Sequence, residues 1–285
     1  MLREIHKWIA ALPRVTAGAM LAASAHVQAI DIYAVTEGGI LARFDSATPG
    51  TVPQLEVVTG LGAGESIVGL DFRPSNGKLY VLTKNPTFSG RLYSVDRMTA
   101  AATLVATLAA DPVDLDFPYT SLSGTKFGMN FNPIVDRLRV VSDNGMNIRV
   151  NPATGLVITD NALNPGTPHV VGVAYINSYA GAASTTLYDI DSSTDSLLVQ
   201  NPVNNGTVTT VGALGVDTTG IAGFDIVTLG SDNFAYATFT VGGTVGLYSI
   251  NLLTGAATSL GSVGGNLELI ALAVLPDYLF RNGFD

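Results

Sequence analysis

Cysteine is absent from this sequence and histidine is scarce, and these two absences exclude much of the chemistry of thiols and metals. The 285 residues contain no Cys and three His. Without thiolates there is no disulfide, no cysteine nucleophile and no thiolate zinc site. Beyond residue 30 the one remaining histidine is His169, so a zinc site built from several histidines is excluded there. Neither G-x-S-x-G nor G-x-x-x-x-G-K-[ST] occurs, and a Ser-His-Asp triad would have to recruit His169.

Charge is also sparse, with 13% charged residues against 47% hydrophobic ones. The formal net charge is −9, and an acidic chain with dispersed cations does not attract phosphate backbones, so we expect no nucleic-acid partner. Long apolar runs are missing after residue 30, so we expect no membrane span in the mature chain. The 31 Gly and 13 Pro are spread along the sequence, as many short strands and turns require.

The first 29 residues are typical of an export signal. Three basic residues flank an apolar, small-residue stretch from Val15 to Val27, and Val27-Gln28-Ala29 fits a signal-peptidase site. A membrane anchor or an ordinary N-terminal helix is the alternative, although the stretch is shorter than the roughly 20 residues that a span needs. We therefore expect a signal peptide over residues 1–29 and a secreted or periplasmic protein.

After residue 30 the sequence repeats one short phrase, an apolar strand that carries a small residue. Repetition at a period of roughly 40 to 60 residues is typical of a modular all-β array. The Gly or Ala in each phrase predicts an innermost strand, where backbones converge on an axis. The phrase occurs as Val68–Phe72, Phe127–Phe131, Val171–Tyr175, Ala222–Ile226 and Ile270–Val274.

Each of the first four phrases leads into three further strand-like segments. In the first complete unit the segments are Ile67–Phe72, Lys78–Thr83, Arg91–Asp96 and Thr103–Leu108, in which apolar and polar residues alternate. Four-stranded antiparallel meanders in radial repetition are the signature of a β-propeller. Complete units span residues 67–108, 126–163, 170–214 and 221–263.

The two ends predict how the ring closes. The chain opens at Asp31–Val35 without a small-residue strand before it, and it finishes with that strand alone at Glu268–Val274. The simplest interpretation is that the C-terminal strand completes the first blade and hides the open strand edges. This gives an all-β, five-bladed β-propeller over residues 30–275 and a tail over residues 276–285. Another blade count and a β-sandwich stay open as alternatives.

Polar residues recur at one position of three inner strands, as Asp71, Asn130 and Asp225, while the other two strands carry Ala. Carboxylate and amide oxygens near the axis suit a hard cation such as Ca²⁺. The alternative is that each side chain bonds to the backbone or an Arg of a neighbouring blade, because a buried carboxylate needs a partner. Two carboxylates and one amide are few for a metal site, so we expect no cofactor and keep Ca²⁺ as the alternative.

The longest connection between blades, residues 109–125, places acidic and aromatic residues side by side. Asp114, Asp116, Phe117 and Tyr119 lie in it, and long loops on a rigid scaffold often carry function. Aromatic rings beside carboxylates suit a sugar or a peptide. The alternative is a solvated insertion that covers a strand edge.

Two further candidate sites involve basic residues and one involves a polar turn. Arg137 and Arg139 share a strand face and suit an anionic ligand, or they pair with carboxylates such as Asp136 and Asp143. His169 precedes an inner strand, where a loop histidine is usually just exposed. The run of residues 189–195 is rich in Asp but lacks the Gly and the distal Glu of an EF-hand loop, which favours a polar hairpin turn.

Three phrases resemble a secreted bacterial family known as domain of unknown function 4394. They are Gly64–Pro74 continuing to Leu79-Tyr80, Phe127–Ser142, and Leu163–Pro168. The resemblance covers about residues 30–275 and implies an exported, repeat-built protein with no assigned activity, so no catalytic residue is carried over. The last ten residues, 276–285, resemble short tails on exported bacterial proteins, with a frayed end as the alternative.

Together these features favour an exported propeller that acts as a ligand-binding or protein-interaction module. Its partners would be a glycan, a peptide or an envelope protein. The alternative function is an extracellular hydrolase of a lactone or glycoside, with carboxylates at the axial mouth and Asp71 and Asp225 as the first candidates.

Overall fold

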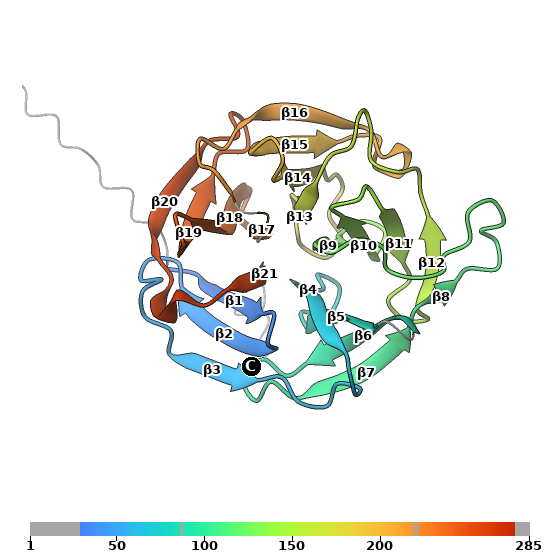
Figure 1. The fold of residues 1–285 in the computed structure, drawn as a ribbon, viewed down its shortest axis with the longest axis horizontal. Helices are drawn as coiled ribbons and strands as arrows, with labels where there is room; N and C mark the ends of the chain where they lie inside the picture. The colour runs from blue at the N-terminus through green and yellow to red at the C-terminus, as the bar shows by residue number, and fades with distance from the viewer. Residues whose placement is uncertain (1–28, 86–87, 219, 221, 277–285) are drawn as a thin grey trace, which may run out of the picture.

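The computed structural model describes residues 29–85, 88–218, 220 and 222–276, and in this part of the chain five β-sheets surround a common axis (Figure 1). Alternating apolar residues form the strands, and the turn residues between them join each strand to the next in an antiparallel meander. The predicted five-bladed propeller is confirmed. The predicted signal peptide and most of the tail lie outside the described residues.

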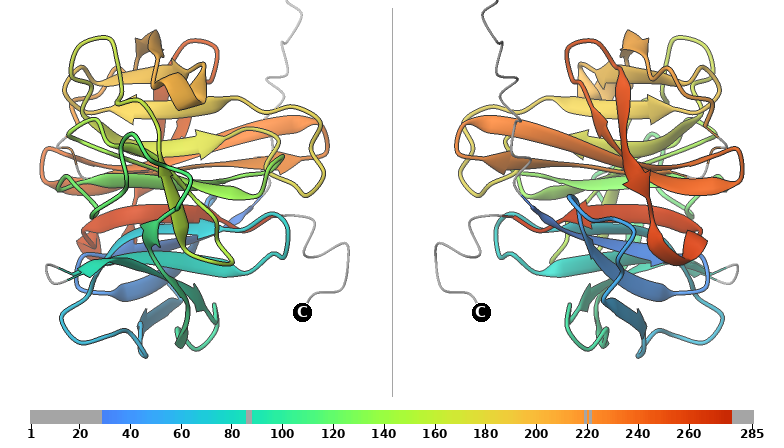
Figure 2. Two further views of the ribbon diagram at one scale, coloured as in Figure 1. Left: turned by 90° about the vertical axis from the view of Figure 1, so that its right-hand side faces the viewer. Right: turned by 90° about the vertical axis from the view of Figure 1, so that its left-hand side faces the viewer.

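The second to fifth blades each follow chain order from the innermost strand outward. The inner strands run in the same direction, so the blades' connecting loops gather on the two faces of the ring (Figure 2). The strands are β4 (Ser66–Phe72), β5 (Leu79–Asn85), β6 (Phe88–Val95) and β7 (Ala102–Thr107); β9 (Phe127–Asn132), β10 (Arg137–Ser142), β11 (Asn147–Val150) and β12 (Leu156–Thr159); β13 (Val170–Tyr175), β14 (Leu187–Asp191), β15 (Ser196–Gln200) and β16 (Val208–Ala213); β17 (Ala222–Leu229), β18 (Asp232–Val241), β19 (Thr244–Ile250) and β20 (Ala257–Ser262).

The first blade is built from both ends of the described chain, as predicted. The last strand, β21 (Leu269–Val274), pairs with β1 (Asp31–Thr36) in antiparallel register, so that Ile32 lies opposite Val274. The sheet continues outward through β2 (Ile40–Asp45) and β3 (Gln54–Val57).

The third blade has one strand that was not predicted. The short strand β8 (Ala109–Ala110) adds in parallel to the outer edge of β12, so that this sheet has five strands. It begins the long connection between the second and third blades. The first part of that connection thus covers a strand edge, which limits edge-to-edge association.

The inner strands pack closely enough that only small residues fit. A Cβ added at Gly128 would lie 2.7 Å from the backbone nitrogen of Val173, and one at Gly223 would lie 2.6 Å from that of Leu272. At these two positions a side chain would meet the backbone of the neighbouring blade, whereas an added Cβ at Gly69 or Gly172 would meet the side chain of Met129 or Phe224.

The core consists of five apolar clusters, one at each interface between adjacent blades. The cluster between the third and fourth blades is the smallest. Polar side chains also bond across that interface, Arg139 to Asn204 and Asn147 to the oxygen of Val203. In the described part of the chain, no helix has the length and apolar character needed to cross a bilayer.

Candidate functional site

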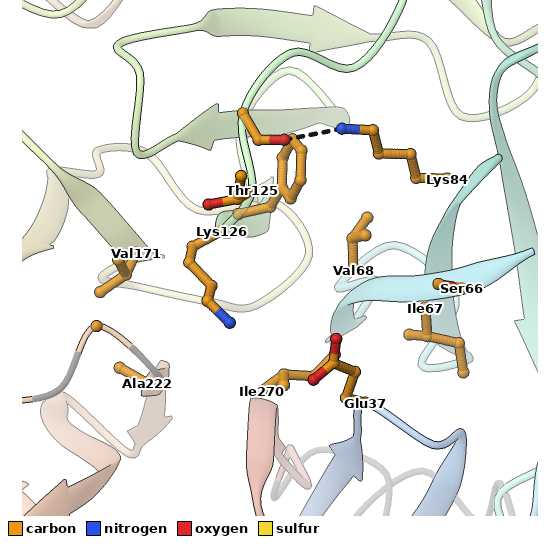
Figure 3. Close-up of a pocket in the computed structure, with 13 residues that line it drawn as sticks. Glu37, Ser66, Ile67, Val68, Lys84, Thr125, Lys126, Val171, Ala222 and Ile270 are labelled. Carbon is orange, nitrogen blue, oxygen red and sulfur yellow. Dashed lines mark hydrogen bonds between the residues drawn. The ribbon is translucent and has the colours of Figure 1, made fainter. Parts of the chain in front are cut away.

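A pocket opens at the mouth of the axis, on the face where the inner strands begin (Figure 3). Its volume is about 290 Å³. The floor is apolar because it is formed by the first residues of several inner strands, among them Ile67, Val171, Ala222 and Ile270. Three charged side chains, Glu37, Lys84 and Lys126, lie around this floor.

Lys84 is held in place by contacts with the segment that leads into β9, on the other side of the pocket. Its Nζ donates a hydrogen bond of 2.8 Å to the backbone oxygen of Gly124 and lies 5.1 Å from the ring centroid of Phe127. The bond and the cation–π contact fix one wall of the pocket. This cation is therefore engaged with the fold.

Lys126 differs from Lys84 because its ammonium is free. Its side chain points into the pocket toward the carboxylate of Glu37 (Figure 3). Among the described residues, no hydrogen bond or ion pair of at most 4.0 Å engages the Lys126 ammonium. A half-buried lysine whose ammonium lies over an apolar floor is suited to receive an anionic group.

The loop that carries Lys126 is anchored next to it. The backbone nitrogen of Thr125 donates to Oδ1 of Asp143 at 2.8 Å, and the Thr125 hydroxyl donates to Oδ2 of the same carboxylate. The backbone nitrogen of Asp143 in turn donates to the Lys126 oxygen at 3.1 Å. These bonds hold the start of β9 against the β10–β11 turn and thereby position Lys126.

The predicted polar ring of Asp71, Asn130 and Asp225 lies away from this mouth, in the walls near the other end of the inner strands. All three side chains are buried. Each accepts a backbone N–H from the next inner strand in the ring, at 2.7, 3.0 and 2.7 Å. The donors are Phe131, Tyr175 and Val274.

Hydrogen bonding also links the ring across the axis, because Asn130 Nδ2 donates to Asp225 Oδ1 at 3.0 Å. Burial raises the pKa of Asp71 well above its usual range, and the neighbouring Asp225 raises it further. Burial raises the pKa of Asp225 to about 7, although the N–H groups of Val274 and Ile226 oppose the shift.

These contacts make the ring poorly suited to Ca²⁺, because its oxygens face N–H donors. Within the described ranges, no group of three or more His, Cys, Asp or Glu residues is arranged to hold a metal ion. The geometry instead matches the interpretation in which each side chain bonds to a neighbouring blade.

The candidates of the long loop do not gather into one site. Tyr119 is buried in the cluster between the second and third blades, and Asp114 Oδ2 accepts the Thr159 backbone N–H at 2.8 Å. Asp116 is exposed, and Phe117 keeps 70% of its surface exposed. None of the four lines the mouth pocket.

His169 is exposed at the start of β13 and does not line the mouth pocket. Its backbone nitrogen donates to Asp191 at 3.2 Å. The same carboxylate accepts from the backbone nitrogen and hydroxyl of Ser193, and Asp195 Oδ1 accepts the Thr218 backbone N–H at 2.9 Å. The Asp-rich hairpin is thus held by hydrogen bonds from its own and neighbouring residues.

Arg137 and Arg139 do share one face of β10, and they line a second pocket between the third and fourth blades. The expected carboxylate partners are different in the structure. Asp136 binds Arg73 of the second blade, at 2.8 and 2.5 Å, and Asp143 binds Thr125. Arg139 pairs instead with Asp160, at 2.7 Å.

Sequence reasoning missed Glu37 and gave no role to Lys84 or Lys126. Lys84 lies near the end of the second strand of its blade, and Lys126 lies at the end of the connection between two blades. In a propeller these two kinds of segment lie on the same face of the ring. This common face could have predicted that the two lysines lie near each other. Glu37 lies in a hairpin turn without any comparable signal.

The fold and this mouth define a five-bladed β-propeller with a small charged pocket on its axis. The family described as "Domain of unknown function (DUF4394)" matches residues 40–273, and the chain belongs to that family. No curated protein matches the chain.

Three solved structures with a similar fold each have low sequence identity to this chain. A nidogen/laminin complex chain is 13% identical, with 87% of this chain and 98% of that chain covered and a TM-score of 0.49. TolB from Acinetobacter baumannii is 13% identical, with 87% and 67% covered and a TM-score of 0.46. A periplasmic gluconolactonase from Pseudomonas aeruginosa is 15% identical, with 83% and 68% covered and a TM-score of 0.41. These likenesses carry no inference about activity.

Proposed function

We propose that this protein is a binding module whose mouth pocket takes a small, partly apolar ligand by its carboxylate group. The observation that carries the proposal is Lys126, a half-buried residue whose ammonium points into the pocket and has no bonded partner among the described residues. The carboxylate would bind Lys126, and the apolar part of the ligand would cover Ile67, Val171 and Ile270.

The size and lining of the pocket support a small acid or the C-terminal end of a peptide over a glycan. A volume of about 290 Å³ is close to the lower limit for ligand pockets. The aromatic residue of the lining, Phe127, is buried and covered by Lys84, so it offers no free face for a sugar ring. An apolar floor with a cation at its edge fits an amphipathic carboxylate better.

The hydrolase alternative has less support from this geometry. Glycoside hydrolysis uses two carboxyl groups that flank one bond. Among the described residues that line the mouth, Glu37 supplies the single carboxylate. Asp71 and Asp225 are buried in the walls, where they accept N–H bonds.

Calorimetric titration with a short apolar peptide, compared with the same peptide carrying a C-terminal amide, tests the proposal. Lys126→Gln should weaken binding of the free acid by roughly tenfold or more, since hydrogen bonds to charged groups contribute about 1.5–3 kcal/mol. Lys78→Gln is the matched control, because this substitution removes the same charge at the opposite end of the inner strands. Equal binding of acid and amide, or equal losses in the two variants, would contradict the proposal.

We also propose that the protein acts outside the cytoplasm. The basic and apolar pattern of residues 1–29 supports export. N-terminal sequencing of the protein recovered from the medium or periplasm should begin at Ile30. Recovery of the chain only from the cytoplasm, with Met1 or Leu2 at its start, would overturn this part.

A further inference from the structure

The interface between the third and fourth blades contains a cleft that is basic in an otherwise acidic protein. Its volume is about 410 Å³, larger than that of the mouth pocket. Arg137 and Arg139 of β10 and Arg149 of β11 line one side, and Tyr175 and Asn204 belong to the other blade. This is also the interface with the smallest apolar cluster, so polar groups replace the usual packing.

The charges of the cleft do not cancel. Asp160 is the carboxylate that pairs with two of the arginines, Arg139 at 2.7 Å and Arg149 at 3.3 Å. Arg137 makes one hydrogen bond in the described part of the chain, a bond of 3.3 Å to the backbone oxygen of Asp136. The carboxylate of Asp136 is engaged by Arg73. An exposed guanidinium therefore stays available at the rim.

The cleft is also rigidly built. Arg139 is only 4% exposed, and its two terminal nitrogens donate to Asn147, Asp160 and Asn204 at 2.7–2.8 Å. Within the described residues the Nε atoms of Arg139 and Arg149 are buried and have no acceptor. Buried donors without acceptors are unfavourable. Arg43, another described residue outside the cleft, has the same unpaired Nε, so the guanidinium of Arg137 is the group on which the case for an anion depends.

A buried carboxyl group, that of Asp189, lies within electrostatic reach of Arg139. Asp189 lies on the same face of β14 as Leu187, which packs against the third blade. Burial raises the pKa of Asp189 well above its usual range, although Arg139 opposes the shift. A neutral carboxyl group would leave the positive charge of the cleft intact.

We infer that this cleft is a second binding site, which takes a small molecule through a phosphate or carboxylate group. The rigid forks of the arginines match both groups. The amides of Asn132 and Asn204, which line the cleft, are suited to hydroxyl groups on the body of the ligand. This site lies away from the mouth pocket and does not depend on the function proposed for it.

Calorimetric titration of the full protein with inorganic phosphate and with malonate, at constant ionic strength, tests the inference. We expect saturable binding of at least one probe, and the tighter of the two identifies the anionic group. Arg137→Gln should weaken that binding at least tenfold. Because the Arg137 side chain is exposed, we expect the variant to fold. Arg97→Gln, at the β6–β7 turn, is the matched control and should bind as the wild type does.

Two results would overturn the inference. One is the lack of saturable binding for both phosphate and malonate. The other is an equal loss of affinity in Arg137→Gln and Arg97→Gln, which would indicate general attraction to surface charge. Lys126→Gln should leave phosphate binding unchanged, and any malonate binding that Lys126→Gln removes but Arg137→Gln does not belongs to the mouth, so failure at the mouth and failure at this cleft can be told apart.

Discussion

Replacing Asp225 by Ala should loosen the closure of the ring. The carboxylate accepts the backbone N–H groups of Val274 and Ile226, both at 2.7 Å, and the amide of Asn130 at 3.0 Å. Alanine leaves these three donors without their acceptor. The substitution creates no steric conflict, because Ala is smaller than Asp, and the repeated phrase already has Ala at the equivalent position 273.

The size of the effect follows from the donors that lose a partner. Each buried, unpaired donor costs about 1–3 kcal/mol, and removal of a buried charge offsets part of that cost. We expect the free energy of unfolding to fall by roughly 2–5 kcal/mol. Urea titrations followed by far-UV circular dichroism measure this difference.

The control is Asp116→Ala, which removes the same charge from an exposed loop and should change stability by less than about 0.5 kcal/mol. Amide hydrogen exchange adds a local test, because protection should fall first in β21. If Asp225→Ala is no less stable than the control, or if β21 keeps its protection, the assigned role of this carboxylate is wrong.

Three further predictions concern pH, packing and an ion pair. Because the pKa of Asp225 is about 7 in the folded state and roughly 3.9 in the unfolded chain, its ionisation opposes folding. The free energy of unfolding of the wild type, relative to that of Asp225→Asn, should therefore fall by up to about 4 kcal/mol as pH rises from about 4 to about 7. If the urea midpoints of the two proteins differ by the same amount at every pH, the prediction is wrong. Gly128→Ala should lower the melting temperature through a loss of about 1–3 kcal/mol, whereas Gly38→Ala, whose Cβ meets nothing closer than 3.8 Å, should be nearly neutral in the same melts. Arg73→Lys should destabilise the protein by about 1 kcal/mol, because lysine cannot reproduce the two bonds to Asp136, and a double-mutant cycle with Asp136→Asn measures the coupling.

The fold was predictable because its main signals are local. The repeated small-residue phrase marks each inner strand, and the lone copy at Glu268–Val274 indicated the shared first blade. The equivalence of Asp71, Asn130 and Asp225 was also predictable, since strand parity alone determines it. The short strand β8 was missed because two alanines carry no pattern, and only the neighbouring edge of β12 makes them a strand.

The pockets were less predictable because their residues come from separate blades. Arg73 meets Asp136 across an interface, and Arg139 binds Asn204 of the next blade, pairs that no sequence spacing indicates. The mouth combines Glu37 of a hairpin turn, Lys84 of strand β5 and Lys126 of the long connection. Charged residues of this kind recur on any soluble surface, and only the ring geometry brings them together.

The register between β1 and β21 has a practical consequence for handling the protein. The backbone nitrogen of Leu275 donates to the oxygen of Asp31 at 2.9 Å, so both extremities of the propeller emerge beside each other. Both extremities lie on the face of the ring where the inner strands end. Ser66 and Ile270, which border the axial opening, lie on the other face. A purification tag, a surface tether or a fused reporter at either extremity would therefore leave that opening accessible.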